Sequence, residues 1–325
     1  MKTYESFTEA YVDLCRSIDQ DFDFLSSPRG MKIKEKLGVQ FRLRNPRARL
    51  PRVPARNFSL SYFVAETLWY LSGDNSTAWI SRYAPFWGNI SDDGVTANSA
   101  YGSRIFRPHS RIAGGSLIQW DYVKEELRRD PDSRRAVIHI RTPDDSRLDS
   151  KDVPCTLALQ FFIRNSLLHL HVSMRSSDII LGLAYDVPAF TTMQEILASE
   201  LGVGLGEYVH TSNSLHCYER DFKMLSEIAQ SNPELRDLEM SPLPGCFPVG
   251  ELFRCEALIR EMSDDDALSG VVPELPALLD ADSARIFADW SVILLTHRVR
   301  RANSDELARS LIKNLSEKTY HCFVR

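Results

Sequence analysis

A cysteine, an arginine and two aspartates that could do chemistry together lie within one stretch, residues 153–190, which reads VPCTLALQFFIRNSLLHLHVSMRSSDIILGLAYDVPAF. A thiol such as that of Cys155 can act as a nucleophile, and a guanidinium such as that of Arg175 can bind anions. The carboxylates of Asp178 and Asp186 can exchange protons. A single cysteine beside a strand is, however, most often a small core residue.

A glutamate lies inside a segment that is otherwise apolar. Residues 57–74, NFSLSYFVAETLWYLSGD, are apolar nearly all round and stop at Gly73, which predicts a buried helix. Glu66 lies in its middle. A glutamate at a helix edge would be ordinary, whereas a buried carboxylate is costly and usually functional. The residues alone favour neither interpretation.

Composition bounds the classes of protein to consider. The 325 residues are 43% hydrophobic, enough for a large core, and the net charge of -5 argues against a nucleic-acid partner. No apolar run approaches the roughly 20 residues that cross a bilayer, and the N-terminus lacks signal-peptide features, so we expect a cytoplasmic protein without a membrane partner. The cysteines show no zinc-like spacing, so we expect no metal; they are Cys15, Cys155, Cys217, Cys246, Cys255 and Cys322.

Apolar periodicity and end signals predict the helices that must position these residues. Ser116 is expected to cap one helix, and Pro188 is expected in the first turn of another that ends at Gly202. The expected helices cover residues 4–19, 57–73, 117–129, 187–202, 283–294 and 304–316.

Three strands are expected at 136–141, 156–164 and 167–174, the last two joined as a hairpin through Asn165-Ser166. Residues 206–218 indicate two short strands around a turn, and residues 21–57 look irregular. The Pro- and acid-rich region at about 231–282 is predicted to be an insertion. The pattern is mixed α+β, without βαβ alternation or a glycine-rich phosphate loop.

Six motifs occur in an order and spacing that resemble the thymidylate synthase family, from about Arg29 to Tyr218. They are AETLWYLSGD, YGSRIFR, DPDSRR, PC…QFF, MRSSD…LGLAYDV and H…SLHCY. The resemblance implies an α+β fold with a mixed sheet packed by helices, a single domain over 1–325, and a homodimer joined sheet to sheet. It also implies a pyrimidine nucleotide substrate and 5,10-methylenetetrahydrofolate as co-substrate, with no metal.

The resemblance also implies a role for individual residues. Cys155 falls on the nucleophile, Glu66 on the general acid–base glutamate, and Tyr101 on a tyrosine near the nucleophile. Arg175 is then the cation expected to lower the thiol pKa of Cys155. The remaining matches are phosphate binding by Arg29, Arg175 and Ser176, phosphate binding across the dimer by Arg134 and Arg135, ribose binding by His216 and Tyr218, and folate contacts by Asp178 and Trp87.

Asp186 departs from the family members that methylate uracil, which have asparagine at this position. Cytosine reverses the donor and acceptor order of uracil at N3 and C4. A neutral Asp186 can donate to N3 and accept from N4–H₂, and an ionised one can accept from both if N3 is protonated. Uracil O4 would instead face a carboxylate oxygen. The alternative is an aspartate that caps the helix before VPAF.

The resemblance therefore implies a cytidylate 5-hydroxymethylase acting on CMP or dCMP, of the kind found in mildiomycin-type nucleoside antibiotic biosynthesis. In such enzymes water adds to the methylene intermediate. Thr156 and Met174 replace a usual histidine and glutamine, and the ending TYHCFVR lacks the usual small apolar tail. The alternatives are a uridylate-methylating enzyme that tolerates Asp186, and a non-catalytic nucleotide- or RNA-binding dimer.

Overall fold

A mixed sheet forms the centre of the computed structural model, which describes residues 1–110, 115–147, 149–235, 238–245, 249–269, 285–313 and 315–323. The path of this eight-stranded sheet is β1-β3-β10-β8-β7-β6, with β2 paired to β3 and β9 to β10; β4 and β5 form a separate pair. The strands are β1 (Lys2–Tyr4), β2 (Phe24–Ser26), β3 (Ile33–Leu43), β4 (His109–Ser110), β5 (Ser116–Leu117), β6 (Val137–His139), β7 (Thr156–Arg164), β8 (Leu167–Met174), β9 (Ser177–Asp178) and β10 (Gly204–Tyr218).

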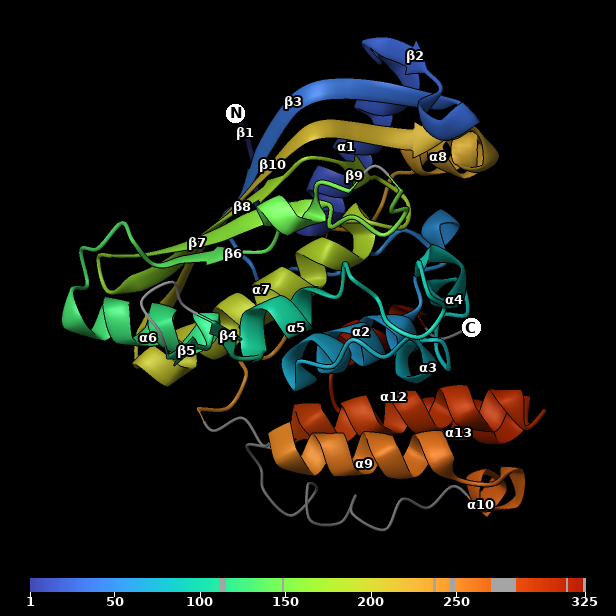
Figure 1. The fold of residues 1–325 in the computed structure, drawn as a ribbon. Helices are drawn as coiled ribbons and strands as arrows, with labels where there is room; N and C mark the ends of the chain where they lie inside the picture. Colours follow the sequence, from blue (N-terminus) through green and yellow to red (C-terminus); the bar gives the residue numbers. More distant parts are fainter. Residues whose placement is uncertain are drawn as a thin grey trace.

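Helices lie in layers beneath this sheet (Figure 1). Helix α7 packs on β8 and β10, α2 packs on α7, and α12 packs on α2 and α9. The helices are α1 (Phe7–Gln20), α2 (Leu60–Ser72), α3 (Thr77–Ile80), α4 (Trp87–Ile90), α5 (Tyr101–Phe106), α6 (Gln119–Arg129), α7 (Leu183–Leu201), α8 (Phe222–Gln230), α9 (Val249–Glu261), α10 (Asp264–Ser269), α12 (Arg285–Arg301) and α13 (Asp305–Lys313). The mixed α+β architecture agrees with the expected fold class.

The hairpin between β7 and β8 has the predicted turn. Asn165 and Ser166 both have positive φ angles, 52° and 58°, the backbone conformation that a two-residue hairpin turn requires. Buried and exposed side chains alternate along β8, so one face of the sheet is packed on helices. This regular hairpin carries Cys155, next to the first residue of β7, to the same end of the sheet as Arg175.

Two predictions for strand regions are wrong. Residues 204–218 form one long strand, β10, because they pair with β3 on one side and with β8 and β9 on the other. This pairing outweighs the turn preference of Ser212, Asn213 and Ser214. Residues 33–43, expected to be irregular, form strand β3, which pairs with β10. Its polar side chains obscure the apolar pattern from which a strand is predicted.

Two helix starts also differ from expectation. Ser116 lies in β5, and α6 begins at Gln119, so Ser116 does not cap it. Helix α7 begins at Leu183, and Pro188 therefore lies inside it. The earlier start places Asp186 within the first turn, where its backbone N–H donates to Gly182 O at 2.9 Å.

Part of the predicted insertion at about 231–282 is helical and packs on the core. Helix α9 carries the buried Glu256, which accepts hydrogen bonds from Trp79 Nε1 at 2.7 Å and from Tyr83 OH at 3.0 Å. Cys246 and residues 236–237, 246–248 and 270–282 lie outside the described residues. Helices α12 and α13 correspond to the two predicted near the end of the chain.

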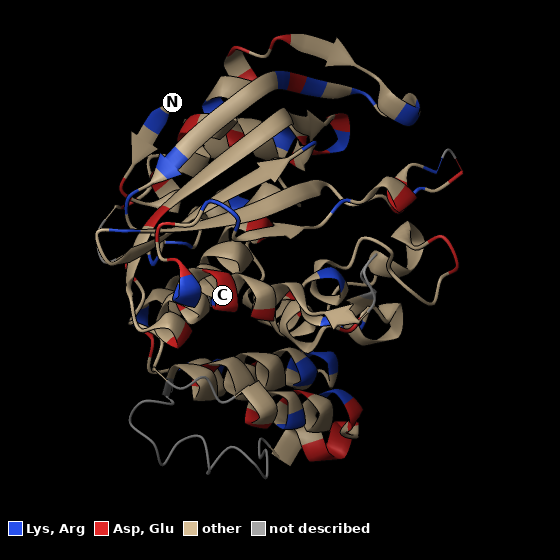
Figure 2. Ribbon diagram, turned by 60° about the vertical axis from the view of Figure 1, so that its left-hand side comes forward, with Lys and Arg blue, Asp and Glu red and all other residues tan. Residues whose placement is uncertain are grey.

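Basic and acidic residues are interspersed on the elements drawn in Figure 2. This agrees with the near-balanced composition of 39 Lys and Arg against 44 Asp and Glu. None of the helices within the described ranges is long and apolar enough to cross a membrane. Those ranges also contain no cluster of His, Cys, Asp and Glu side chains that could hold a metal ion.

Candidate active site

A cavity of about 980 Å³ brings together most of the predicted site residues. Its walls come from the sheet end at β8–β10, from α2, α4 and α5, and from the start of α7. Eleven of the predicted residues line it: Arg29, Glu66, Trp87, Tyr101, Cys155, Arg175, Ser176, Asp178, Asp186, His216 and Tyr218. The two that do not are Arg134 and Arg135.

Cys155 and Arg175 are adjacent, as expected. Arg175 Nη2 lies 3.7 Å from Cys155 Sγ, and the same guanidinium donates to the carbonyls of Pro154 at 2.9 Å and Val153 at 2.8 Å. The prediction that Arg175 lowers the thiol pKa of Cys155 below its ordinary value is wrong for this structure. Burial raises the pKa of Cys155, and Arg175 opposes this rise only in part. The thiol therefore needs a proton acceptor, or further positive charge, when it reacts.

Glu66 is a buried carboxylate, which favours the functional interpretation of this residue. It is 5% exposed on α2, and its Oε1 accepts a hydrogen bond from Tyr62 OH at 2.6 Å. Burial raises the pKa of Glu66 to about 7, while hydrogen bonds from Tyr62 and Tyr70 oppose the rise. A carboxyl that titrates near neutral pH can both accept and donate a proton during one reaction cycle.

Asp186 faces the cavity from the first turn of α7 and is 7% exposed. The alternative that it caps this helix is wrong, because Gly182 holds the cap position and α7 has no side-chain cap. Within the described ranges, no hydrogen bond is formed by the Asp186 carboxyl. Burial, and then the charges of Glu66 and Asp178, raise the pKa of Asp186 well above its ordinary value. A buried polar group without a partner is costly, so this carboxyl is suited to bind a ligand group.

The expected ribose residues His216 and Tyr218 lie close to Asp178, one of the two expected folate residues. Asp178 Oδ1 accepts from the backbone N–H of Ile180 at 2.8 Å, and burial raises the Asp178 pKa while the nearby His216 opposes the rise. His216 is 5% exposed, and burial lowers its pKa. Arg220 lies over the ring of Tyr218 at 4.5 Å and 3.8 Å from Asp178. Asp178 thus lies on the His216 side of the cavity.

Two aromatic residues border the reacting groups. Tyr101 is buried at the start of α5, its ring 5.8 Å from Phe190 of α7. Burial, and then the charges of Asp186 and Cys155, raise the pKa of Tyr101 well above its ordinary value. Trp87 lies in α4, and its Nε1 donates to Tyr62 OH at 3.1 Å. Tyr101 therefore lies on the Cys155 side of the cavity and Trp87 on the Glu66 side.

The arginines expected to bind phosphate fall into two groups. Arg29 lies in a short turn with φ 54°, next to Gly30 with φ 77°, and lines the cavity. Arg134 and Arg135 are exposed on the loop before β6, outside the cavity of their own chain. The backbone of this loop is held by Gln160, which donates to Arg134 O at 2.9 Å. Donation of the pair to a second subunit stays a prediction.

Several residues that line the cavity lie outside the sequence motifs. Tyr62 lies four positions before Glu66 on α2, so helical spacing places the two side chains on one face. Arg220 follows Tyr218 closely in sequence and reaches back over its ring. Arg141 and Lys151 add positive charge to the wall. Spacing could have identified Tyr62, but the other three depend on how loops fold back.

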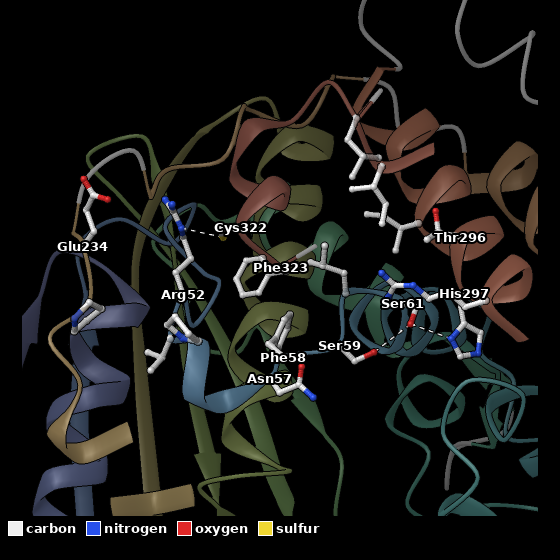
Figure 3. A pocket seen from close by; sticks show the side chains of 18 of the residues that line it. Arg52, Asn57, Phe58, Ser59, Ser61, Glu234, Thr296, His297, Cys322 and Phe323 are labelled. Carbon is white, nitrogen blue, oxygen red and sulfur yellow. Dashed lines mark hydrogen bonds between the residues drawn. The ribbon is translucent and has the colours of Figure 1, made fainter. Parts of the chain in front are cut away.

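A second cavity of about 500 Å³ lies between the loop before α2 and helices α12 and α13 (Figure 3). Phe58 lines it and stacks at 4.6 Å on Tyr185, which lines the first cavity. Ser61 Oγ lies 3.3 Å from His297 Nδ1, but His297 Nε2 meets the backbone carbonyl of Arg82, not a carboxylate. This serine and histidine therefore lack the third group of a hydrolytic triad.

Comparison with known proteins relates this chain to a protein family and to a phage enzyme. The family model described as thymidylate synthase matches residues 9–243. A relative named deoxyuridylate hydroxymethyltransferase, from Bacillus phage SP01, is 36% identical over 223 residues, which are 66% of this chain and 58% of the relative. The match thus spans less than two thirds of the length of that relative.

Proposed function

This chain belongs to the thymidylate synthase family, and we propose that it transfers a one-carbon unit from 5,10-methylenetetrahydrofolate to C5 of cytidylate. Water then completes a 5-hydroxymethyl product. The observation that carries the choice of base is the unpartnered, buried carboxyl of Asp186 in the cavity that also holds Cys155 and Glu66.

The protonation of Asp186 supports cytosine as the base. Its raised pKa favours a neutral carboxyl, which can donate to cytosine N3 and accept from N4–H₂. If the proton moves to N3, the resulting carboxylate still pairs with cytosine. Uracil can pair only with the neutral acid, because its O4 cannot donate to a carboxylate. Cytosine therefore forms matched hydrogen bonds with Asp186 whether the proton lies on the carboxyl or on N3. Uracil forms matched hydrogen bonds only when the proton lies on the carboxyl.

The hydroxymethyl product is supported by the relative from Bacillus phage SP01, whose name describes hydroxymethyl transfer. The base in that name is deoxyuridylate, so deoxyuridylate hydroxymethylation is the second candidate function for this chain. The choice between the two bases rests on Asp186. The nucleoside-antibiotic role and the cytoplasmic location stay predictions.

The cavity suits a nucleotide together with a folate. A volume of about 980 Å³ is at the upper end of the range for small-molecule pockets, about 300–1,000 Å³. Phe86 and Trp87 line the part near Glu66 and give it an apolar wall against which a planar ring can pack. When bound there, the folate supplies the one-carbon unit to C5.

The residues of this chain would then act in sequence on the nucleotide. Cys155 Sγ bonds to C6 of the pyrimidine, and Asp186 gives its proton to N3 as electron density moves towards it. C5 becomes enamine-like and takes the one-carbon unit. Once the C5 proton and the spent folate have left and water has added to the new carbon, the Cys155–C6 bond breaks and its electrons return to sulfur. The N3 proton then returns to Asp186. Metal ions have no role in this proposal.

We also propose a homodimer with shared sites. Among the described residues, the sheet face that carries His169, His171 and Ser173 is not packed on helices, and these side chains are exposed or half-buried. In the proposed dimer, Arg134 and Arg135, which do not line the cavity of their own chain, contribute to the cavity of the other subunit. Guanidinium groups suit phosphate through paired hydrogen bonds.

Mixed inactive variants should regain activity if the sites are shared. Cys155→Ala lacks the nucleophile and Arg135→Ala lacks a donated phosphate ligand, so each homodimer should be inactive. A hybrid dimer contains one site with both residues intact. Activity is measured after subunit exchange, which tagged subunits verify. If exchange is complete and activity stays at the level of the separate variants, sharing of Arg135 is refuted.

Base choice is tested by competition. Equal amounts of CMP, dCMP, UMP and dUMP are incubated with the protein and 5,10-methylenetetrahydrofolate, and the masses of the products are measured by mass spectrometry. A cytidylate that gains CH₂O supports the proposal. Gain of CH₂O by dUMP supports the second candidate, and gain of CH₂ would mean methylation.

A further inference from the structure

Three side chains in the cavity form a hydrogen-bonded chain that neither the motifs nor the family match assign. Trp87 Nε1 donates to Tyr62 OH at 3.1 Å, and Tyr62 OH donates to Glu66 Oε1 at 2.6 Å. All three line the cavity, Trp87 from α4 and the other two from α2. This series of hydrogen bonds ends at the carboxyl of Glu66, whose pKa is about 7.

The direction of these hydrogen bonds follows from the donors. An indole N–H can only donate, so Tyr62 OH is an acceptor towards Trp87. A phenol has one proton, and that proton must then point at Glu66 Oε1. Oε1 is therefore held as an acceptor. Tyr70 is a second hydroxyl near this carboxyl and also opposes the rise of its pKa. The oxygen that Tyr62 does not hold, Oε2, is the one that can gain and lose a proton.

Packing fixes the phenol in this position. The Tyr62 ring is 7% exposed, with ring centres 4.6 Å from Tyr185 and 5.7 Å from Phe86, both at steep angles. Burial and the charge of Glu66 raise the pKa of Tyr62 well above its ordinary value. The phenol therefore stays protonated and remains a donor throughout the working pH range.

Building on the proposed function, we propose that Tyr62 is a positioning residue that holds Glu66 as the base for the water that adds to the methylene intermediate. With Oε1 occupied by Tyr62, Oε2 is directed to the water. Trp87 completes the arrangement by fixing the phenol. Tyr62 acts through Glu66 and need not touch the nucleotide.

Addition of water releases the product from Cys155. The water oxygen bonds to the exocyclic carbon on C5, and one water proton passes to Glu66 Oε2. The electron pair of the exocyclic double bond moves to C5 and forms the C5–C6 double bond. The Cys155–C6 bond breaks, and its electron pair leaves with the sulfur. Glu66 later returns its proton to the thiolate or to solvent.

The charged and titratable groups around Glu66 set the pH range of this step. Glu66 must be ionised to accept a proton, and its pKa is about 7. The Tyr62 hydrogen bond opposes the effect of burial, so its loss moves the pKa of Glu66 upwards. The groups that face Glu66 are Tyr62 and Tyr70 from α2, Tyr101 from α5, and Tyr185 and Asp186 from α7.

The test uses Tyr62→Phe, which removes the hydroxyl and keeps the ring. The substrate is CMP or dCMP with tritium at C5, whichever the wild type turns over, with 5,10-methylenetetrahydrofolate. Tritium release reports loss of the C5 proton, and hydroxymethyl product reports water addition. We expect product formation at pH 7 to fall about tenfold, the scale for losing a hydrogen bond to a charged group. Tritium release should fall less, and the rising limb of the kcat profile should move to higher pH.

A thiol trap and a matched control variant show whether the effect of Tyr62→Phe is specific to water addition. Added 2-mercaptoethanol should capture the intermediate that water no longer reaches efficiently, giving a thioether at the C5 methylene in Tyr62→Phe. The control is Tyr4→Phe, because Tyr4 is also 7% exposed and also donates to a carboxylate, Asp13, at 2.5 Å. Tyr4 lies outside the cavity wall. The control should keep the wild-type product-to-tritium ratio and pH profile.

The outcomes separate this inference from the proposed function. If the wild type releases no tritium from CMP or dCMP, the proposed function fails. If the wild type is active and Tyr62→Phe keeps one product per tritium released, the inference about Tyr62 is overturned, whatever the change in rate. A lowered ratio, a trapped thioether and a shifted pH limb together support it.

Discussion

Replacing Cys155 by alanine is expected to abolish turnover while the nucleotide still binds. Every later step depends on the bond between Cys155 Sγ and C6 of the pyrimidine, because C5 is a poor nucleophile without it. Loss of a nucleophile normally lowers kcat by several orders of magnitude. Turnover is measured by mass spectrometry of the product, and binding of CMP and dCMP by calorimetry.

The control for this variant is Cys322→Ala. Cys322 also accepts a hydrogen bond from an arginine, Arg52, at 3.1 Å, but it lines the second cavity. It should retain wild-type turnover. Residual activity of Cys155→Ala above about a hundredth of wild type would refute the nucleophile assignment.

Replacing Asp186 by asparagine should shift the base preference from cytidylate to uridylate. An amide can form hydrogen bonds with either base, but it cannot transfer a proton to cytosine N3 when Cys155 adds. Cytidylate kcat/KM should therefore fall by about tenfold to a hundredfold or more. Uridylate turnover should appear or rise, because an amide N–H can donate to O4 at every pH. The measurement is kcat/KM for CMP, dCMP, UMP and dUMP.

A second variant at this position separates proton transfer from simple loss of contact. Asp186→Ala removes both donor and acceptor, so it should weaken turnover of both bases without raising that of uridylate. We expect the uridylate product of Asp186→Asn still to be hydroxymethylated in part, because water reaches the intermediate from the Glu66 side. If the ratio of kcat/KM for cytidylate to kcat/KM for uridylate is unchanged in Asp186→Asn, Asp186 does not determine which base is used.

Most of the cavity is predictable from sequence because its residues lie in short motifs. Cys155, Arg175 and Asp186 come from one continuous stretch, and a hairpin with a recognisable Asn165-Ser166 turn brings the first two together. Glu66 lies in an apolar helix, so its burial also follows from the pattern. The roles of these residues stay predictions that the experiments above address.

What the sequence does not show depends on tertiary context. The net pKa of Cys155 is set by how deeply the folded chain buries the thiol, which no motif reveals. Strand β10 looks like two strands because Ser212, Asn213 and Ser214 favour turns. Its pairing on both sides makes it continuous. The hydrogen bond from Trp87 to Tyr62 joins helices α4 and α2, and only the folded arrangement identifies it.

In the proposed reaction, water attacks a methylene group on a cytosine bound by Cys155 and Asp186. Running the reaction on CMP or dCMP in water enriched in oxygen-18 tests both the source of the oxygen and the choice of base. We expect a cytidylate product that gains one CH₂O unit whose oxygen carries the heavy isotope. A cytidylate that gains CH₂ without oxygen, or an oxygen-18 product formed from uridylate but not from cytidylate, would contradict it.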